Sequence, residues 1–283
     1  MRHILTIARF TVHEAVSRRL VLASAILSLV FIGLYALGFW FLFTQAEPSG
    51  RPATPSELAT AGTMLTVLGL YAVYFLSSFV ALFLTVGAIS SEVDSGTLHA
   101  VLARPIRRAD VVVGRWLAYA GLVGVYVALM AGSVLGLAWL VIGYQALAWP
   151  STVGLMVLGA IVLLTLSLLG STMLSTLANG VVSFTLFGLA WLGGIIEFIG
   201  TMMKNEAMLN LGIVISLLVP SDAIWKAASF YAQSPLFLVV QGVSGAGPFA
   251  AAAPPTASFI VWALLYLCAV LLLAVRAFAR RDL

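Results

Sequence analysis

Six long apolar runs, separated by short polar breaks, constrain this chain more than any other feature of its sequence. A helix crosses the hydrocarbon core of a bilayer with about 20 apolar residues. Backbone polar groups in lipid must pair inside the protein, so a spanning segment is either a helix or a strand of a closed barrel. Runs of this length without alternation of apolar and polar residues favour helices. We therefore predict an all-α integral membrane protein, a single transmembrane domain over 1–283, with spans at 20–43, 59–89, 116–142, 152–177, 181–200 and 256–275.

The positive charges of the chain indicate its orientation. Of its 14 Lys and Arg residues, 11 lie in three places, which six crossings put on the same side of a membrane. Cytoplasmic loops collect Lys and Arg, so we predict a multi-pass protein of the cytoplasmic membrane with both termini in the cytoplasm. The net charge of +4 is then a sign of topology, and we expect no nucleic-acid partner. The three groups are Arg2, Arg9, Arg18 and Arg19 at the N-terminus, Arg104, Arg107, Arg108 and Arg115 in the 90–115 break, and Arg276, Arg280 and Arg281 in the 276–283 tail.

The composition excludes several other classes of protein. Apolar residues make up 62% of the chain and charged residues 8%, far from the composition of a soluble globular protein. Cys268 is the only cysteine, so neither a disulfide framework nor a cysteine-based metal site forms within one chain. Lys204 and Lys226 are the only lysines, and neither lies in a glycine-rich loop followed by Ser or Thr. The chain therefore has no P-loop with which to bind ATP.

The N-terminal residues 1–19 have the spacing of an amphipathic helix. Apolar side chains such as Ile4 and Val12 recur on one helical face, while Arg2 and Arg9 lie largely on the other. We predict a short interfacial helix on the cytoplasmic membrane surface, with its arginines toward lipid phosphates. The alternative is a solvated, arginine-rich flank that only fixes the orientation of the first span.

The stretch 201–255 is the least regular part of the chain. Its strongly apolar piece, Leu211–Val219, is too short to cross the membrane and fits a re-entrant or an interfacial segment on the extracytoplasmic side. Asp222 then lies in the first turn of a predicted short helix, with Lys226 four residues later.

Between the fourth and fifth spans, the break at 178–180 predicts a tight turn, which makes those spans antiparallel neighbours.

Residues 90–115 form the most heavily charged break and join the second and third spans. Leu98, Val101 and Leu102 give an apolar stripe at helical spacing, and Pro105 ends that predicted helix. An amphipathic helix held across the ends of two membrane helices is a rigid lever, which can dock in the groove of a partner and pass motion to the spans. From these residues alone, a charged connector that merely orients the two spans is an equally good interpretation.

The same segment carries a motif that runs from Glu92 through Gly96-Thr97-Leu98, Pro105-Ile106 and Arg108 to Gly114-Arg115. It resembles the membrane permease subunits of ABC-2 type ABC transporters, in which a Glu, a Gly-Thr-Leu, a Pro, an Arg and a Gly-Lys lie across the link between helices 2 and 3. Arg115 stands where Lys is usual and keeps the charge. The resemblance extends over nearly the whole chain. Two later features, Glu197 and the run VPSDAIWK at 219–226, are similar to the permease of the nitrous-oxide-reductase maturation exporter.

The resemblance implies a division of labour between subunits. In this family the link between helices 2 and 3 is a coupling helix that sits in a cleft of a separate ATP-hydrolysing subunit. That partner would bind ATP and Mg, whereas this chain would bind no cofactor and would not itself be an enzyme. A second copy, or a similar permease, would complete the twelve helices usual in the family. The residues that the resemblance places at the ATPase interface are Glu92, Gly96, Thr97, Leu98, Leu102, Pro105 and Arg108.

Glu197 is the only acid within a predicted span, and an intramembrane carboxylate is by default a functional-site hypothesis. It lies three residues from the end of that span, so the alternative to a role in a pathway or in gating is an acid that simply reaches interfacial water.

In the third span, Gly132 and Gly136 form a GxxxG pattern, which permits close helix contact. Because small residues are abundant throughout the spans, we expect this pair to pack inside the chain rather than at a dimer seam.

Three methionines on the far side, Met202, Met203 and Met208, raise the question of soft-metal binding. Methionines without nearby Cys or His are usually interfacial apolar residues, so we predict no metal site.

The leading hypothesis from the sequence is a permease subunit of an ATP-driven exporter. An intramembrane enzyme would need catalytic residues that converge in the bilayer, and Glu197 alone is available. The remaining alternative is a membrane scaffold, in which an ATPase partner drives a conformational change without export. The apolar spans are compatible with lipids, amphipathic drugs or peptides as substrates and do not distinguish among them.

Overall fold

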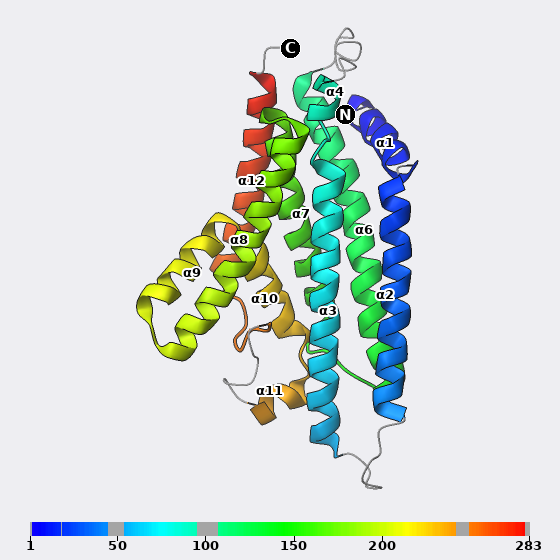
Figure 1. The fold of residues 1–283 in the computed structure, drawn as a ribbon, viewed down its shortest axis with the longest axis vertical. Coiled ribbons are helices and arrows are strands. Elements are labelled where there is room, and N and C mark those ends of the chain that lie inside the picture. Colours follow the sequence, from blue (N-terminus) through cyan, green and yellow to red (C-terminus); the bar gives the residue numbers. More distant parts are fainter. Residues whose placement is uncertain (1, 18, 45–53, 95–106, 242–248, 281–283) are drawn as a thin grey trace.

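The computed structural model describes residues 2–17, 19–44, 54–94, 107–241 and 249–280, and within these ranges the chain is helical and contains no strand. Six of the described helices are long and apolar enough to cross a membrane, and they form an elongated bundle (Figure 1). The predicted all-α fold with six transmembrane helices is thereby confirmed. The six are α2 (Arg19–Thr44), α3 (Pro55–Thr85), α6 (Arg108–Ile142), α7 (Trp149–Met173), α8 (Thr176–Met203) and α12 (Ala257–Ala279).

Helices α3 and α7 form the centre of the bundle, and α2 and α12 lie at its rim. Within the most apolar window of each helix, 56% of the residues are buried in α3 and α7, against 6% in α2 and 17% in α12. The rim helices therefore present apolar side chains to the outside, as a helix in contact with lipid does. Because lipid tails are as apolar as leucine, close packing rather than escape from water holds such helices together. Gly69 illustrates this, since a Cβ there would lie 2.5 Å from the ring of Tyr35 on α2.

Local sequence signals set the ends of several helices. Thr54 caps α3: its Oγ1 accepts a hydrogen bond from the Glu57 N–H at 3.3 Å, and the Glu57 carboxylate accepts one from the Thr54 N–H at 2.7 Å. Pro55 occupies the first turn, where its missing N–H costs nothing. At the end of α6, Gly143 takes a left-handed φ of 67°, which glycine adopts without a steric penalty.

Helix α1 (Arg2–Ser17) lies across the ends of α2 and α6 (Figure 1). Thr11 and Ala15 are buried, while Leu5, Arg9 and Phe10 are exposed. The predicted amphipathic segment thus folds as a helix whose inner face packs on the bundle. Its position on a membrane surface stays a prediction.

The described parts of the three arginine-rich groups meet at one end of the bundle. Figure 1 shows α1, the start of α6 and the end of α12 at the same end. A contact supports this arrangement, because the Arg108 guanidinium donates a hydrogen bond to the Ala279 carbonyl at 3.3 Å. The assignment of this end to the cytoplasm rests on the charge distribution; we call it the arginine end and the opposite one the far end.

A bent helix pair fills the region before α12. Helix α9 (Glu206–Leu218) folds back along α8, and α10 (Ser221–Ala232) turns by 99° from α9 and packs among α3, α7 and α8 (Figure 1). The short α11 (Pro235–Gln241) follows. The pair has the geometry of a broken span or a re-entrant segment.

The structure corrects two expectations. The turn between the fourth and fifth spans lies at 174–175 rather than 178–180, because Ser175 caps α8 by accepting a hydrogen bond from the Ala178 N–H at 3.5 Å. The GxxxG pair does not pack inside the described part of the chain, since a Cβ added at Gly132 or Gly136 would meet nothing within 4 Å. Both glycines instead line an open groove near Trp139.

Candidate functional site

The described part of the predicted ATPase interface lies at the arginine end, between α3 and α6. Glu92 lies in the short helix α4 (Ser90–Asp94), and Arg108 begins α6. The structure therefore describes the two helix ends that flank 95–106. The other predicted interface residues, Gly96, Thr97, Leu98, Leu102 and Pro105, lie outside the described residues.

Glu92 and Arg115 join these two helix ends. The Arg115 guanidinium, whose side chain is 9% exposed, forms an ion pair with the Glu92 carboxylate and donates a second hydrogen bond to the Ala88 carbonyl. Its planar fork of donors suits two acceptors held at fixed positions. Hydrogen bonds to charged groups contribute about 1.5–3 kcal/mol each. One buried arginine thus ties α6 to the turn at 86–89 and to α4.

Gly114, the neighbour of Arg115, allows α1 to approach α6. A Cβ at this position would lie 2.9 Å from Ile7 Cγ2 and 3.0 Å from the Ile4 carbonyl oxygen. The Gly114-Arg115 pair of the motif therefore has two structural roles, since the glycine seats α1 and the arginine holds α4. We call Glu92, Gly114 and Arg115, with the residues they contact, the arginine-end cluster.

Asn179 extends this network to α8. Its side-chain amide donates to the Val86 carbonyl at 2.8 Å and to the Ser167 carbonyl at 2.9 Å, and its oxygen accepts from the Ser183 hydroxyl at 3.1 Å. Gly170 leaves room for it, because a Cβ there would lie 2.0 Å from Asn179 Oδ1. Every side-chain polar atom of Asn179 is thus engaged where α3, α7 and α8 meet.

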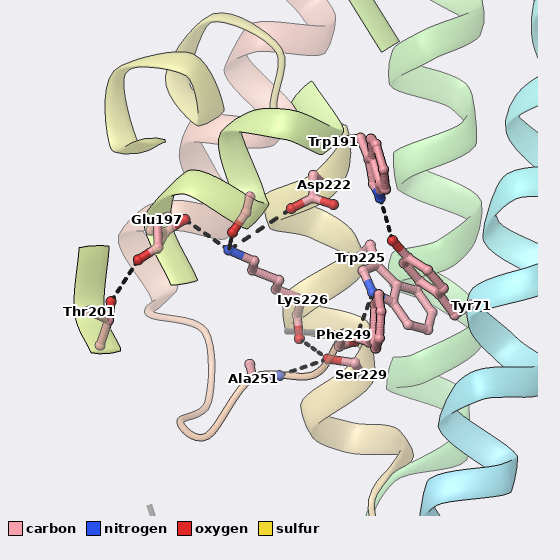
Figure 2. Close-up of polar contacts among 11 residues, drawn as sticks. Tyr71, Trp191, Glu197, Thr201, Asp222, Trp225, Lys226, Ser229, Phe249 and Ala251 are labelled. Carbon is pink, nitrogen blue, oxygen red and sulfur yellow. Dashed lines mark hydrogen bonds and ion pairs between the residues drawn. The ribbon is translucent and has the colours of Figure 1, made fainter. Parts of the chain in front are cut away.

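A second charged group lies where α8 and α10 meet (Figure 2). The Lys226 ammonium donates to the Glu197 carboxylate at 2.9 Å and to the Gly194 carbonyl at 3.1 Å. The nearest Asp222 carboxylate oxygen lies 3.9 Å from the same nitrogen. Asp222 is 4% exposed, so two carboxylates and one ammonium share a partly buried space. We call Glu197, Asp222 and Lys226 the triad.

Two glycines of α8 and α9 create the space for the triad. A Cβ at Gly194 would lie 1.8 Å from Asp222 Oδ2, and a Cβ at Gly212 would lie 2.6 Å from Glu197 Cβ. Larger residues at these positions would push the acids away from the lysine. The glycines therefore position the charges and also allow α9 and α10 to pack closely on α8.

Aromatic residues hold α10 in place beside the triad. Trp225 is 2% exposed and donates to the Phe249 carbonyl at 3.0 Å, while its ring packs on Tyr71 and Tyr74 of α3. The Trp191 indole of α8 donates to the Tyr71 hydroxyl at 2.5 Å (Figure 2). The contacts of Trp225 fix the register of α10, and hence of Lys226, against α3, and the Trp191–Tyr71 bond ties α3 to α8.

The far-side methionines lie at the end of α8 and in α9. Met202 and Met203 end α8 and are 71% and 67% exposed, and Met208 lies in α9. Within the described ranges, no group of three His, Cys, Asp or Glu side chains has the geometry to hold a metal ion.

Sequence reasoning located Glu197 but missed its partner. The spacing of Asp222 and Lys226 suggested a pair within one helix, whereas the shorter contact of Lys226 is with Glu197, 29 residues away. Only the tertiary packing of α10 on α8 brings these two together. Likewise, the motif identified Arg115, but the sequence contained no sign that it reaches the Ala88 carbonyl.

Comparison with known proteins identifies the family. A family model described as ABC-2 family transporter protein matches residues 6–283, which include both charged clusters and all six candidate spans. No curated protein matches the chain. Because the match covers nearly the entire sequence, the chain belongs to the ABC-2 transporter family and is a multi-pass membrane permease component of the kind that associates with an ABC ATPase.

Proposed function

We propose that this chain is the permease subunit of an ATP-driven exporter and that residues 90–115 couple it to a separate ATPase subunit. Family membership supports the ATPase partner. The observation that carries the coupling role is the ion pair between Glu92 and Arg115, which links both helix ends that flank 95–106. A force applied between these ends would act on α3 and α6 together.

The arginine-end cluster would transmit such a force as a joint, by which we mean a rigid connection between helices. Arg115 bonds both the Ala88 carbonyl and Glu92, so a shift of α4 would move α6 with it. Helix α1 rests on Gly114 and would follow the same motion. Asn179 bonds the Val86 carbonyl and carries the shift to α8. Two copies of this chain, or one copy and a similar permease, would each dock on one ATPase subunit.

Co-purification tests the partner directly. The tagged chain is expressed with its neighbouring genes, extracted in mild detergent, and its bound proteins are identified. We expect a stoichiometric ATPase subunit, and its loss in variants of residues 92–108. A stable homo-oligomer without an ATPase, under conditions that preserve known complexes, would contradict the proposal.

Point variants test the coupling segment in the reconstituted complex. We expect Glu92→Ala and Leu98→Asp to lower substrate-stimulated ATPase activity while membrane insertion stays normal. Glu206→Gln, at an exposed acid in the first turn of α9, is the matched control and should leave the activity unchanged. Wild-type stimulation in both coupling variants would refute the role of this segment. If the ATPase complex forms but no substrate stimulates it, the alternative of a mechanical scaffold gains support.

A further inference from the structure

A pocket of about 320 Å³ that is open to the surface, which we call the cavity, lies beside the triad. Its walls come from α8, α9, α10 and residues 251–259, and most of the side chains that line it are apolar, among them Leu217 and Phe259. The charged side chains that line it are Glu197 and Lys226. A volume of this size is at the lower end of the range for small-molecule sites, and an apolar cavity with a few convergent polar groups is typical of them.

The triad beside this cavity has two acidic side chains and one basic side chain, although Asp222 itself does not line the cavity. Lys226 uses its ammonium on the Gly194 carbonyl and the Glu197 carboxylate, and Asp222 stands at 3.9 Å. One ammonium therefore faces two carboxylates. Such a group carries either a net negative charge or a proton shared with a carboxylate. When the triad carries a net negative charge, a cation that enters the cavity is stabilised because it neutralises that charge.

A hydroxyl group beside the cavity lacks a partner. Ser216 of α9 lines the same cavity and is 8% exposed, and its Oγ has no hydrogen-bond partner among the described residues. A buried hydroxyl without a partner is unfavourable, and Ser216 shares this state with five other described residues, none of which lines the cavity. Its Oγ exposes almost no surface, so an N–H donor in the cavity would supply the missing partner once the Ser216 side chain rotates toward it. Ser216 is thus a polar group beside the cavity whose hydrogen-bonding capacity is unused, separate from the acids.

We propose that this cavity binds the cationic amino group of an amphipathic molecule. The ammonium group lies against Glu197 and Ser216, and its apolar body lies along Leu217 and Phe259. This assignment goes beyond the proposed permease function and does not depend on it, since it concerns equilibrium binding without ATP. The amine can come from a free amphiphile or from an aminophospholipid headgroup, and the experiment separates these two sources.

Charge-selective thiol labelling tests the proposal. In a Cys268→Ser background, Ala253→Cys places a thiol on the wall of the cavity, and Ser151→Cys places one at the exposed start of α7. The protein is held in phosphatidylcholine nanodiscs and labelled with 2-aminoethyl or 2-sulfonatoethyl methanethiosulfonate. We expect the ratio of the cation labelling rate to the anion labelling rate at position 253 to be at least ten times the same ratio at position 151. We call the quotient of these two ratios the normalised ratio.

Two further substitutions should move this normalised ratio in opposite directions. Glu197→Gln removes the acid that lines the cavity and should bring the ratio close to one. Lys226→Gln leaves two carboxylates unopposed and should raise it above the wild-type value. General misfolding would move both variants the same way. A ratio that Glu197→Gln leaves unchanged would overturn the proposal.

Protection from labelling tests the amphipathic ligand itself. Decylamine should slow labelling at Ala253→Cys at least tenfold, whereas decanol at the same membrane concentration should not. Ser216→Ala should weaken the protection by decylamine about three- to tenfold. Discs that contain phosphatidylethanolamine should show the same protection without decylamine if the occupant is a lipid headgroup, and otherwise the free amine is the ligand. Equal protection by decylamine and decanol would refute a site for an amino group.

Discussion

At the arginine end one buried arginine meets one carboxylate, whereas between α8 and α10 one lysine is shared by two. The guanidinium of Arg115 has a fixed fork and donates to a carboxylate and a backbone carbonyl. The ammonium of Lys226 sits on a flexible stem between Glu197 and Asp222 (Figure 2). The balanced cluster has the properties of a joint, and the unbalanced one has those of a site that accepts a further charge.

Removal of the arginine should produce the largest effect. Arg115→Met leaves Glu92 and the Ala88 carbonyl without their charged donor, so we expect a loss of about 3 kcal/mol or more in stability, the sum of two hydrogen bonds to a charged group. Substrate-stimulated ATPase activity should fall at least tenfold. Arg115→Lys keeps the charge and should retain most of both. Thermal unfolding and ATPase assays on the reconstituted complex measure these effects.

The control for this prediction is Arg276→Met. Arg276 is exposed at the same end and forms no ion pair with a described residue. Its loss should change neither stability nor coupling by much. Normal coupling in Arg115→Met would show that the joint is not needed, and the contrast between the two clusters would lose its mechanical meaning.

A smaller effect is expected from one added methyl group behind the triad. Gly194→Ala places a Cβ 1.8 Å from Asp222 Oδ2, and overpacking of this kind costs about 1–3 kcal/mol. Gly188→Ala in the same helix meets nothing within 4 Å and should be neutral or stabilising by up to about 1 kcal/mol, since alanine favours helix. The thermal midpoints of the two variants should move apart. Equal midpoints would mean that Asp222 has room to retreat and that the triad is not held as tightly as its geometry indicates.

The sequence predicted those features that depend on local pattern. Runs of about 20 apolar residues predicted the six helices, and the family motif led to Glu92 and Arg115. The helix cap was harder to recognise in the sequence. The residues at 178–180 had suggested a turn, whereas Ser175 caps α8 and the turn lies at 174–175. Because Ser175 caps α8, residues 178–180 belong to the first turns of that helix.

Contacts between helices that are far apart in the sequence could not be predicted, and the reason is physical. Lys226 lies close in sequence to Asp222, but the 99° bend between α9 and α10 turns it toward Glu197. Gly132 and Gly136 show the converse, since their pattern permits close packing without specifying which helix face receives a neighbour. Helix register and bend angle decide both cases, and neither is encoded in a short motif.

The smallest predicted effect compares one substitution at both places. Ser183→Ala removes the donor to Asn179 Oδ1 near the arginine end and should cost about 0.5–1.5 kcal/mol. Ser216→Ala removes a hydroxyl without a partner and should leave stability unchanged or slightly higher. Thermal unfolding in the same zwitterionic detergent, without added amine, measures both. If Ser216→Ala destabilised the protein as much as Ser183→Ala, the hydroxyl would already be satisfied in the empty cavity. The Ser216 hydroxyl would then be hydrogen-bonded, like the polar groups of the arginine-end cluster. It could no longer be assigned to a ligand.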